Sequence, residues 1–169
     1  NQSSFNNHIG VPVSLSQIPE SASFCVLEVG MNKKGEIKKL SELIKPDLAI
    51  ITAVEQSHLQ GLKDLRNIAL AKSEILYSLP KYGCFIFNKD TNFSQMLNDK
   101  AIKLKINNII SYGVSNSANI KLINFKLNNN VYFIKANCFG KIIEWEMPAI
   151  GEHWIHNSLS IIAAGIYYD

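Results

Sequence analysis

The feature that most constrains the fold is an alternation of short apolar runs with helical patterns between residues 20 and 113. The apolar runs predict strands at 23–30, 48–54, 84–88 and 108–113. The patterns between them predict helices at 36–45, 64–79 and 92–104, with Asp64 as the N-cap of the second and Pro80 just past its end. Strands that are apolar throughout and separated by helices are typical of a parallel sheet covered on both faces. The sequence therefore predicts an α/β fold with its functional loops at the carboxyl ends of the strands.

The pattern changes at about 118–147, where three segments alternate apolar and polar residues. They are separated by residues 128–130, all asparagine, and by Phe139-Gly140. This arrangement predicts a small antiparallel β meander attached to the mostly parallel sheet, with one face in water. An apolar helix is expected at 152–168. The 169 residues suit one domain, and both ends of the chain look cut from something longer.

Composition argues against several classes of protein. Apolar residues make up 47% of the chain, enough for a packed core, yet no apolar run approaches the ~20 residues of a membrane-spanning helix. Of the 17 basic residues only Arg66 is arginine, and the lysines are scattered, which favours a solvated surface over a nucleic-acid interface. Cys25, Cys84 and Cys138 form no CxxC pair, which argues against a disulfide or zinc framework and suits a reducing cytosol.

The segment GMNKKGEI (30–37) is the closest match to a phosphate-binding loop, GxxxxGK[ST]. Glu36 stands where the lysine is required, and a carboxylate there would repel a phosphate. The segment is therefore interpreted as a strand-to-helix turn that uses its glycines for backbone freedom.

Three side chains have positions that suit a cation site. Glu28 lies near the end of the first predicted strand, His58 just beyond the second, and Lys72 in the helix pattern of 64–79 beside apolar positions. The carboxyl edge of a parallel sheet could bring them together around a hard divalent cation. Spacing alone also permits ordinary surface roles, since loop histidines and helix lysines usually lie in water. His153 and His156 could likewise share a metal or simply pack within the last helix.

Six blocks in order make a more specific pattern than any one residue: NNHIGVPVSL (6–15), LEVGMNKKGEI (27–37), TAVEQSHL (52–59), IALAKSEI (68–75), FNKD (87–90) and GEHWIHNSLSIIAAG (151–165). Together they resemble the central, ATP-binding domain of the Mur ligases. The first two blocks are most similar to the branch that adds D-alanyl-D-alanine to UDP-N-acetylmuramoyl-tripeptide (MurF type). The likeness covers essentially the whole chain.

The resemblance implies a P-loop-ligase-like domain truncated at both ends, without the N-terminal substrate domain, the phosphate loop and the C-terminal domain. It implies a cytoplasmic, monomeric parent enzyme that uses ATP and Mg²⁺ in peptidoglycan synthesis, and hence in cell-wall biogenesis, cell shape and division. In the implied reaction, ATP phosphorylates the terminal carboxylate of the UDP-muramoyl tripeptide, and the amine of D-Ala-D-Ala attacks the acyl phosphate. Its partners are these two substrates and the missing domains, with no nucleic acid and no membrane insertion.

The same resemblance implies roles for individual residues. Glu28, His58 and a carbamylated Lys72 match catalytic magnesium ligands, and burial of the lysine would favour the neutral amine that carbamylation requires. His153 and Asn157 match residues expected near ATP, with Asn157 at the adenine. Asn6 and Asn7 match the loop expected near the UDP-sugar peptide. Trp154 and Gln60 depart from the family pattern, which commonly has asparagine and glutamate there.

Two alternatives remain open at this point. One is another Mur or folylpolyglutamate-type amide ligase, against which the NNHIGVP block argues. The other is a non-catalytic α/β module that binds a ligand or partner, motivated by the missing phosphate-loop lysine. The isolated fragment is expected to have no measurable ligase activity and weak nucleotide affinity at best.

Overall fold

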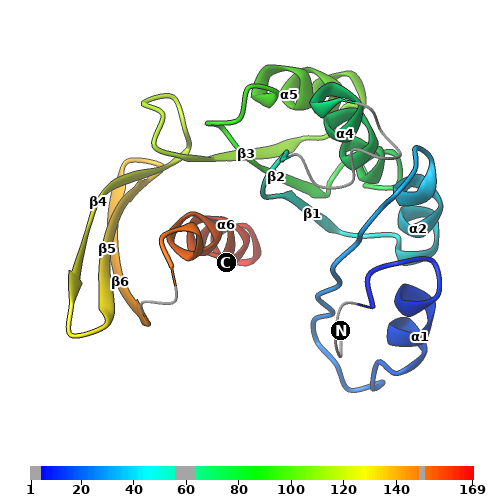
Figure 1. The fold of residues 1–169 in the computed structure, drawn as a ribbon, viewed down its shortest axis with the longest axis horizontal. Helices are drawn as coiled ribbons and strands as arrows, with labels where there is room; N and C mark the ends of the chain where they lie inside the picture. The colour runs from blue at the N-terminus through cyan, green and yellow to red at the C-terminus, as the bar shows by residue number, and fades with distance from the viewer. Residues whose placement is uncertain (1–4, 56–63, 149–150) are drawn as a thin grey trace.

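A computed structural model describes residues 5–55, 64–148 and 151–169, and the predicted α/β fold is confirmed (Figure 1). In these ranges the strands form one six-stranded sheet in the order β1-β2-β3-β4-β5-β6. The strands are β1 (Leu48–Ile51), β2 (Cys84–Asn88), β3 (Asn108–Gly113), β4 (Ile120–Asn128), β5 (Val131–Cys138) and β6 (Lys141–Pro148). Strands β1 to β4 pair in parallel, β4 only through its first residues, and β4 to β6 form the predicted antiparallel meander.

The helices cover both faces of the parallel part of the sheet. They are α1 (Gly10–Ser16), α2 (Glu36–Ile44), α4 (Leu65–Lys72), the 3₁₀ helix η1 (Ser73–Tyr77), α5 (Ser94–Lys103) and α6 (His153–Tyr168). Figure 1 shows α6 on one side of the sheet and α4 and α5 on the other. None of the helices in the described ranges is long and apolar enough to span a membrane.

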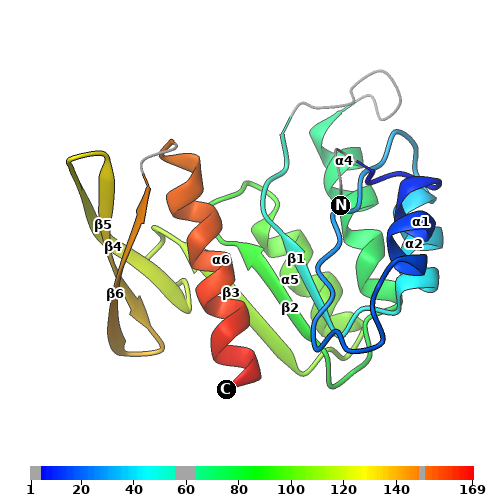
Figure 2. The same cartoon turned by 90° about the horizontal axis from the view of Figure 1, so that it is seen from below.

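Successive side chains of β2 point to opposite faces of the sheet and contribute to two different hydrophobic cores. Cys84 and Ile86 lie in the core under α6, while Phe85 and Phe87 lie in the core beneath η1 and α5. All four side chains are at most 1% exposed, which explains why this strand reads as a continuous apolar run. Figure 2 shows that α6 begins at the end of the molecule at which β1 leaves the sheet. That end is the carboxyl edge, where the sequence places its functional loops.

The strand predicted at 23–30 is wrong. Residues 24–30 have no regular secondary structure, and Phe24 and Val26 are 70% and 90% exposed. The Gly30 N–H instead donates to the carbonyl of Asn6, at 2.7 Å, in the loop before α1. A β-rich composition makes a strand only where a neighbouring strand accepts its backbone hydrogen bonds, and here no described strand pairs with this segment.

The helix predicted at 64–79 begins as expected but changes type within its length. The Asp64 carboxylate accepts a hydrogen bond from Asn67 N–H at 2.7 Å, which confirms the predicted N-cap. The α-helix then ends at Lys72 and continues as 3₁₀ helix through Tyr77. At the junction the Ser73 hydroxyl donates to the Leu70 carbonyl at 2.7 Å, a local bond that competes with regular helical bonding.

The FNKD block shapes the end of β3. The Asp90 carboxylate accepts hydrogen bonds from Val114 N–H (2.7 Å) and Ser115 N–H (2.9 Å). Gly113, with φ +146°, lies so close to this carboxylate that a side chain would collide with it. A glycine is required here because the backbone is both left-handed and closely approached.

The three cysteines differ in accessibility, which gives a simple test of the fold. Cys25 is exposed, whereas Cys84 and Cys138 are buried and all three are free thiols. Burial raises the pKa of Cys84 to about 12, so on the order of 10⁻⁴ of that thiol is ionised at pH 8. We expect iodoacetamide to label Cys25 alone in the native protein, and all three after denaturation, as measured by mass spectrometry. Rapid native labelling of Cys84 would contradict this core.

Candidate active site

Lys72 lies at the junction of α4 and η1, on a half-buried position rather than on an open helix face. The neighbouring Ile68, Ala69 and Ala71 are essentially fully buried. Burial lowers the pKa of Lys72, and the negative charges of Glu55 and Glu28 partly oppose this effect. The charges of two carboxylates from other parts of the chain therefore act on the amine, whose surroundings favour its neutral form more than water does.

Glu28 is exposed and held by a neighbouring loop. Its Oε1 accepts a hydrogen bond from the Asn6 side-chain amide at 2.9 Å. The same Asn6 accepts the Gly30 N–H through its backbone carbonyl, and Gly30 packs so closely on the Asn6 amide that a Cβ would lie 2.8 Å from it. Glu28 was expected near the end of a strand, but residues 24–30 have no regular secondary structure and Glu28 lies at the surface.

A shared apolar cluster explains how these segments meet. Met31 and Ile37 pack with Ile68 and Ala71 in one core. Val29 and Val54, which adjoin Glu28 and Glu55 in the chain, pack against the same cluster. The hydrophobic contacts therefore place both acidic residues beside the helix that ends in Lys72.

His58, the third predicted ligand, lies outside the described residues, as does Gln60. Within the described ranges no three His, Cys, Asp or Glu side chains form a metal-binding cluster. The predicted set depends on His58 and on a modified Lys72, so it stays a prediction. Sequence reasoning assigned no role to Glu55, although an acidic residue four positions after β1 and three before His58 was a usable signal.

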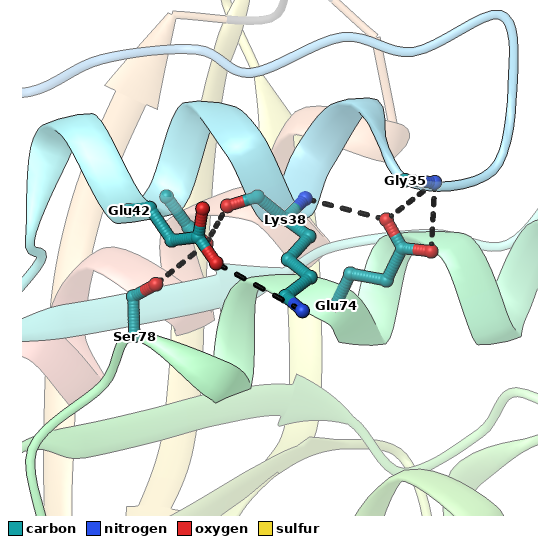
Figure 3. Close-up of polar contacts among 6 residues, drawn as sticks. Gly35, Lys38, Glu42, Glu74 and Ser78 are labelled. Atoms are coloured by element: carbon teal, nitrogen blue, oxygen red, sulfur yellow. Dashed lines mark hydrogen bonds and ion pairs between the residues drawn. The ribbon is translucent and has the colours of Figure 1, made fainter.

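The GMNKKGEI segment is a turn whose backbone amides are occupied by carboxylates of the protein itself. The Glu36 carboxylate accepts from Asn32 N–H (2.7 Å) and Lys33 N–H (3.1 Å). The buried Glu74 carboxylate accepts from Gly35 N–H and Lys38 N–H (Figure 3). The geometry agrees with the interpretation of this segment as a turn, since a phosphate would have to displace both acids.

The residues predicted near ATP lie on α6, which packs on the opposite face of the sheet from α4. His153 is the first residue of α6 and is exposed, and Asn157 is half-buried one turn later. His156 is half-buried, and its Nδ1 has no hydrogen-bond partner among the described residues. His153 and Asn157 thus lie at the carboxyl edge of the sheet, on the helix that covers the face opposite to α4 (Figure 1 and Figure 2). Their role at the nucleotide stays a prediction.

Asn6 and Asn7, predicted near the UDP-sugar peptide, have structural partners. Asn6 holds Glu28, and the Asn7 side-chain carbonyl accepts from Ile9 N–H and Gly10 N–H, both at 3.0 Å, at the start of α1. A cavity of about 200 Å³ adjoins both asparagines, next to His8, Gly30 and Asn32. A larger cavity of about 430 Å³ lies away from these residues, on the meander beside Lys135 and Glu144.

The environment of Lys72 predicts an unusual labelling profile. In CO₂-free buffer with EDTA, acetic anhydride should acylate Lys72 at lower pH than Nα-acetyl-lysine added as an internal reference, because burial lowers the pKa of Lys72. Glu55→Gln removes a charge that raises this pKa, so its labelling curve should move to still lower pH. Mass spectrometry across a pH series gives both curves. A Lys72 profile that coincides with the reference would contradict the half-buried environment.

Comparison with known proteins adds independent evidence. The family model for the Mur ligase middle domain matches residues 1–165. The UDP-N-acetylmuramoyl-tripeptide–D-alanyl-D-alanine ligase of Bacillus subtilis is 35% identical over 170 residues, which covers 97% of this chain and 34% of the relative. The chain spans about a third of the length of the curated relatives it matches.

Solved structures share the fold. MurF from Acinetobacter baumannii superposes with a TM-score of 0.89 at 23% identity, over 99% of this chain and 36% of that one. MurF from Thermotoga maritima in complex with ADP gives a TM-score of 0.79 at 17% identity, over 92% of this chain and 35% of that one. The resemblance seen in the six sequence blocks is confirmed, and the chain belongs to the Mur ligase middle-domain family.

Proposed function

We propose that this chain is the ATP-binding middle domain of a ligase that joins D-Ala-D-Ala to UDP-N-acetylmuramoyl-tripeptide. Its N-terminal substrate domain, phosphate loop and C-terminal domain belong to the rest of the parent protein. The observation that carries the proposal is that the charges of Glu28 and Glu55 act on a half-buried Lys72, beside the apolar cluster in which their chain segments pack together. The similarity to curated D-Ala-D-Ala-adding ligases supports this choice of substrates.

The residues at the site suit a divalent cation. A neutral Lys72 amine can attack CO₂ and lose a proton, which converts a cation into an anionic N-carboxylate. That product would place further negative charge beside Glu28 and Glu55, an arrangement that is unfavourable without a positive ion. Carboxylate and carbamate oxygens, with the imidazole of His58, are donors that Mg²⁺ accepts. Glu28, His58 and carbamylated Lys72 are therefore the proposed magnesium ligands.

Each residue then has a defined task in acyl-phosphate formation. A carboxylate is a poor electrophile, so the tripeptide's terminal carboxylate must first take a phosphoryl group from ATP. Bound Mg²⁺ would offset the negative charge where the triphosphate and this carboxylate meet. Glu28, His58 and Lys72 would hold the ion, with Asn6 orienting Glu28. His153 and Asn157 would position the nucleotide from the other face of the sheet. Asn6 and Asn7 also border the proposed path of the UDP-sugar peptide.

The biological setting follows from these substrates. We place the parent enzyme in the cytoplasm as a monomer that serves peptidoglycan synthesis, and through it cell shape and division. It requires neither nucleic acid nor membrane insertion for the reaction proposed.

The test is phosphate release by the full-length parent protein with ATP, Mg²⁺, UDP-muramoyl tripeptide and D-Ala-D-Ala. We expect release that depends on the dipeptide, and no measurable ligase activity from residues 1–169 alone. Release with glutamate or another amino acid as the acceptor would identify a different amide ligase of the superfamily. Absence of release with every acceptor would favour a non-catalytic module.

A further inference from the structure

We propose that Glu74 is a positioning residue that fixes the loop bearing Glu28 relative to Lys72. The inference rests on the proposed function, in which Glu28 and Lys72 hold one cation. It adds a residue that contacts neither the cation nor the substrates and acts through the backbone of residues 28–35.

Glu74 is a buried carboxylate with an unusual set of partners. It follows Lys72 by two residues, in η1, and is only 6% exposed. Both of its oxygens accept the Gly35 N–H at 2.9 Å, and Oε2 also accepts the Lys38 N–H at 3.3 Å (Figure 3). These donors belong to the start of α2, where helix N–H groups have no acceptor within the helix. Glu74 therefore attaches the beginning of α2 to η1, the 3₁₀ helix that directly follows Lys72.

Further contacts extend this attachment from Gly35 back to Glu28. The Glu36 carboxylate bonds Asn32 N–H and Lys33 N–H within the same loop. Met31 is buried against Ile68 and Ala71 of α4. The Gly30 N–H is bonded to Asn6, whose side chain holds Glu28. A shift at the Glu74 end of the loop would therefore be passed along to Glu28.

A second polar contact also attaches α2 to the segment around η1, but at the opposite end of α2 from Glu74. The hydroxyls of Ser41 in α2 and Ser78 after η1 lie 2.9 Å apart, toward the far end of α2 from the Glu28 loop. Burying a carboxylate is costly because it loses its contacts with water. The hydroxyl contact between Ser41 and Ser78 attaches α2 without that cost. The placement of Glu74 at the loop end of α2, two residues from Lys72, is explained by a requirement for accurate geometry at the cation site.

The test compares Glu74→Gln, Ser78→Ala and wild type in the full-length protein. Glutamine keeps the size of the side chain but only one acceptor oxygen. We expect Glu74→Gln to weaken Mn²⁺ binding, measured by electron paramagnetic resonance in the presence of ADP, by about 10-fold. The Mg²⁺ concentration for half-maximal activity should rise by the same factor, while KM for D-Ala-D-Ala stays unchanged. Ser78→Ala and the exposed Glu42→Gln should leave Mn²⁺ binding as in wild type.

The outcomes separate this inference from the proposed function. Unchanged Mn²⁺ binding and an unchanged Mg²⁺ midpoint in Glu74→Gln would overturn the positioning role, even if the wild-type enzyme is an active ligase. A wild type without dipeptide-dependent phosphate release would overturn the function, and the Mn²⁺ measurement would still report on Glu74. If Glu74→Gln does not fold, Glu74→Asp keeps both oxygens but shortens the reach. It should weaken Mn²⁺ binding by a smaller factor, and wild-type binding in it would also count against the inference.

Discussion

Replacing Lys72 with alanine in the full-length protein should lower ligase turnover by about 10²- to 10³-fold, with the fold intact. The change removes the amine that becomes the proposed anionic ligand, while the neighbouring Ile68 and Ala71 keep their packing. A helix-favouring alanine is readily accommodated at the end of α4. Initial rates of phosphate release with saturating substrates, together with the melting temperature, separate loss of chemistry from loss of structure.

Rescue distinguishes a carbamate from an ordinary lysine. A short carboxylic acid such as formate or acetate can enter the space left in Lys72→Ala and supply the missing anion, so part of the activity should return with rising acid concentration. Methylamine, which supplies a cation instead, should not restore activity. Rescue by the amine but not by the acid would show that Lys72 acts as an ammonium group.

Glu28→Gln is expected to have the second largest effect, a loss on the order of 10²-fold at fixed Mg²⁺. Glutamine retains a side-chain oxygen that can accept the Asn6 amide at the position of Oε1, so the loop should keep its conformation. What is lost is the negative charge that a hard cation requires. Activity measured against Mg²⁺ concentration should show a shifted midpoint, whereas Glu42→Gln, on the exposed side of α2, should match wild type. An unshifted curve for Glu28→Gln would remove Glu28 from the ligand set.

The parts of the fold that the sequence predicted well are those in which local pattern and tertiary environment agree. Strands 84–88 and 108–113 have the predicted bounds because both faces of the sheet are buried there, so an apolar run is the required pattern. The meander was predicted from period-two alternation and asparagine- or glycine-containing turns, and Asn129, Asn130 and Phe139 indeed adopt positive φ.

The failures arise where partners far along the chain decide the outcome. Residues 23–30 have the composition of a strand, but composition does not specify a neighbour for pairing, and in the described structure they follow the surface. The change from α-helix to 3₁₀ helix after Lys72 is not visible in the sequence pattern, because turns of the two helix types place apolar residues at similar spacings.

The candidate site was only partly predictable for the same reason. Glu28 contributes to the electrostatic environment of Lys72, but it comes from a surface loop and not from a strand end, and its role as a cation ligand stays a prediction. Glu74 was overlooked because a glutamate in a helix pattern looks like a surface residue, and its acceptor role depends on the distant amides of Gly35 and Lys38. Asn6 likewise gains its role by contact with Glu28, which its own loop sequence does not show.

Diffraction from crystals of the full-length protein grown with Mn²⁺ and a non-hydrolysable ATP analogue would test the cation site most directly. The anomalous signal of manganese locates the ion independently of any assumption about its ligands. We predict a peak within coordination distance of a Glu28 oxygen, an imidazole nitrogen of His58 and a carbamate oxygen on Lys72. A fully occupied manganese peak that none of these three side chains contacts would contradict the account.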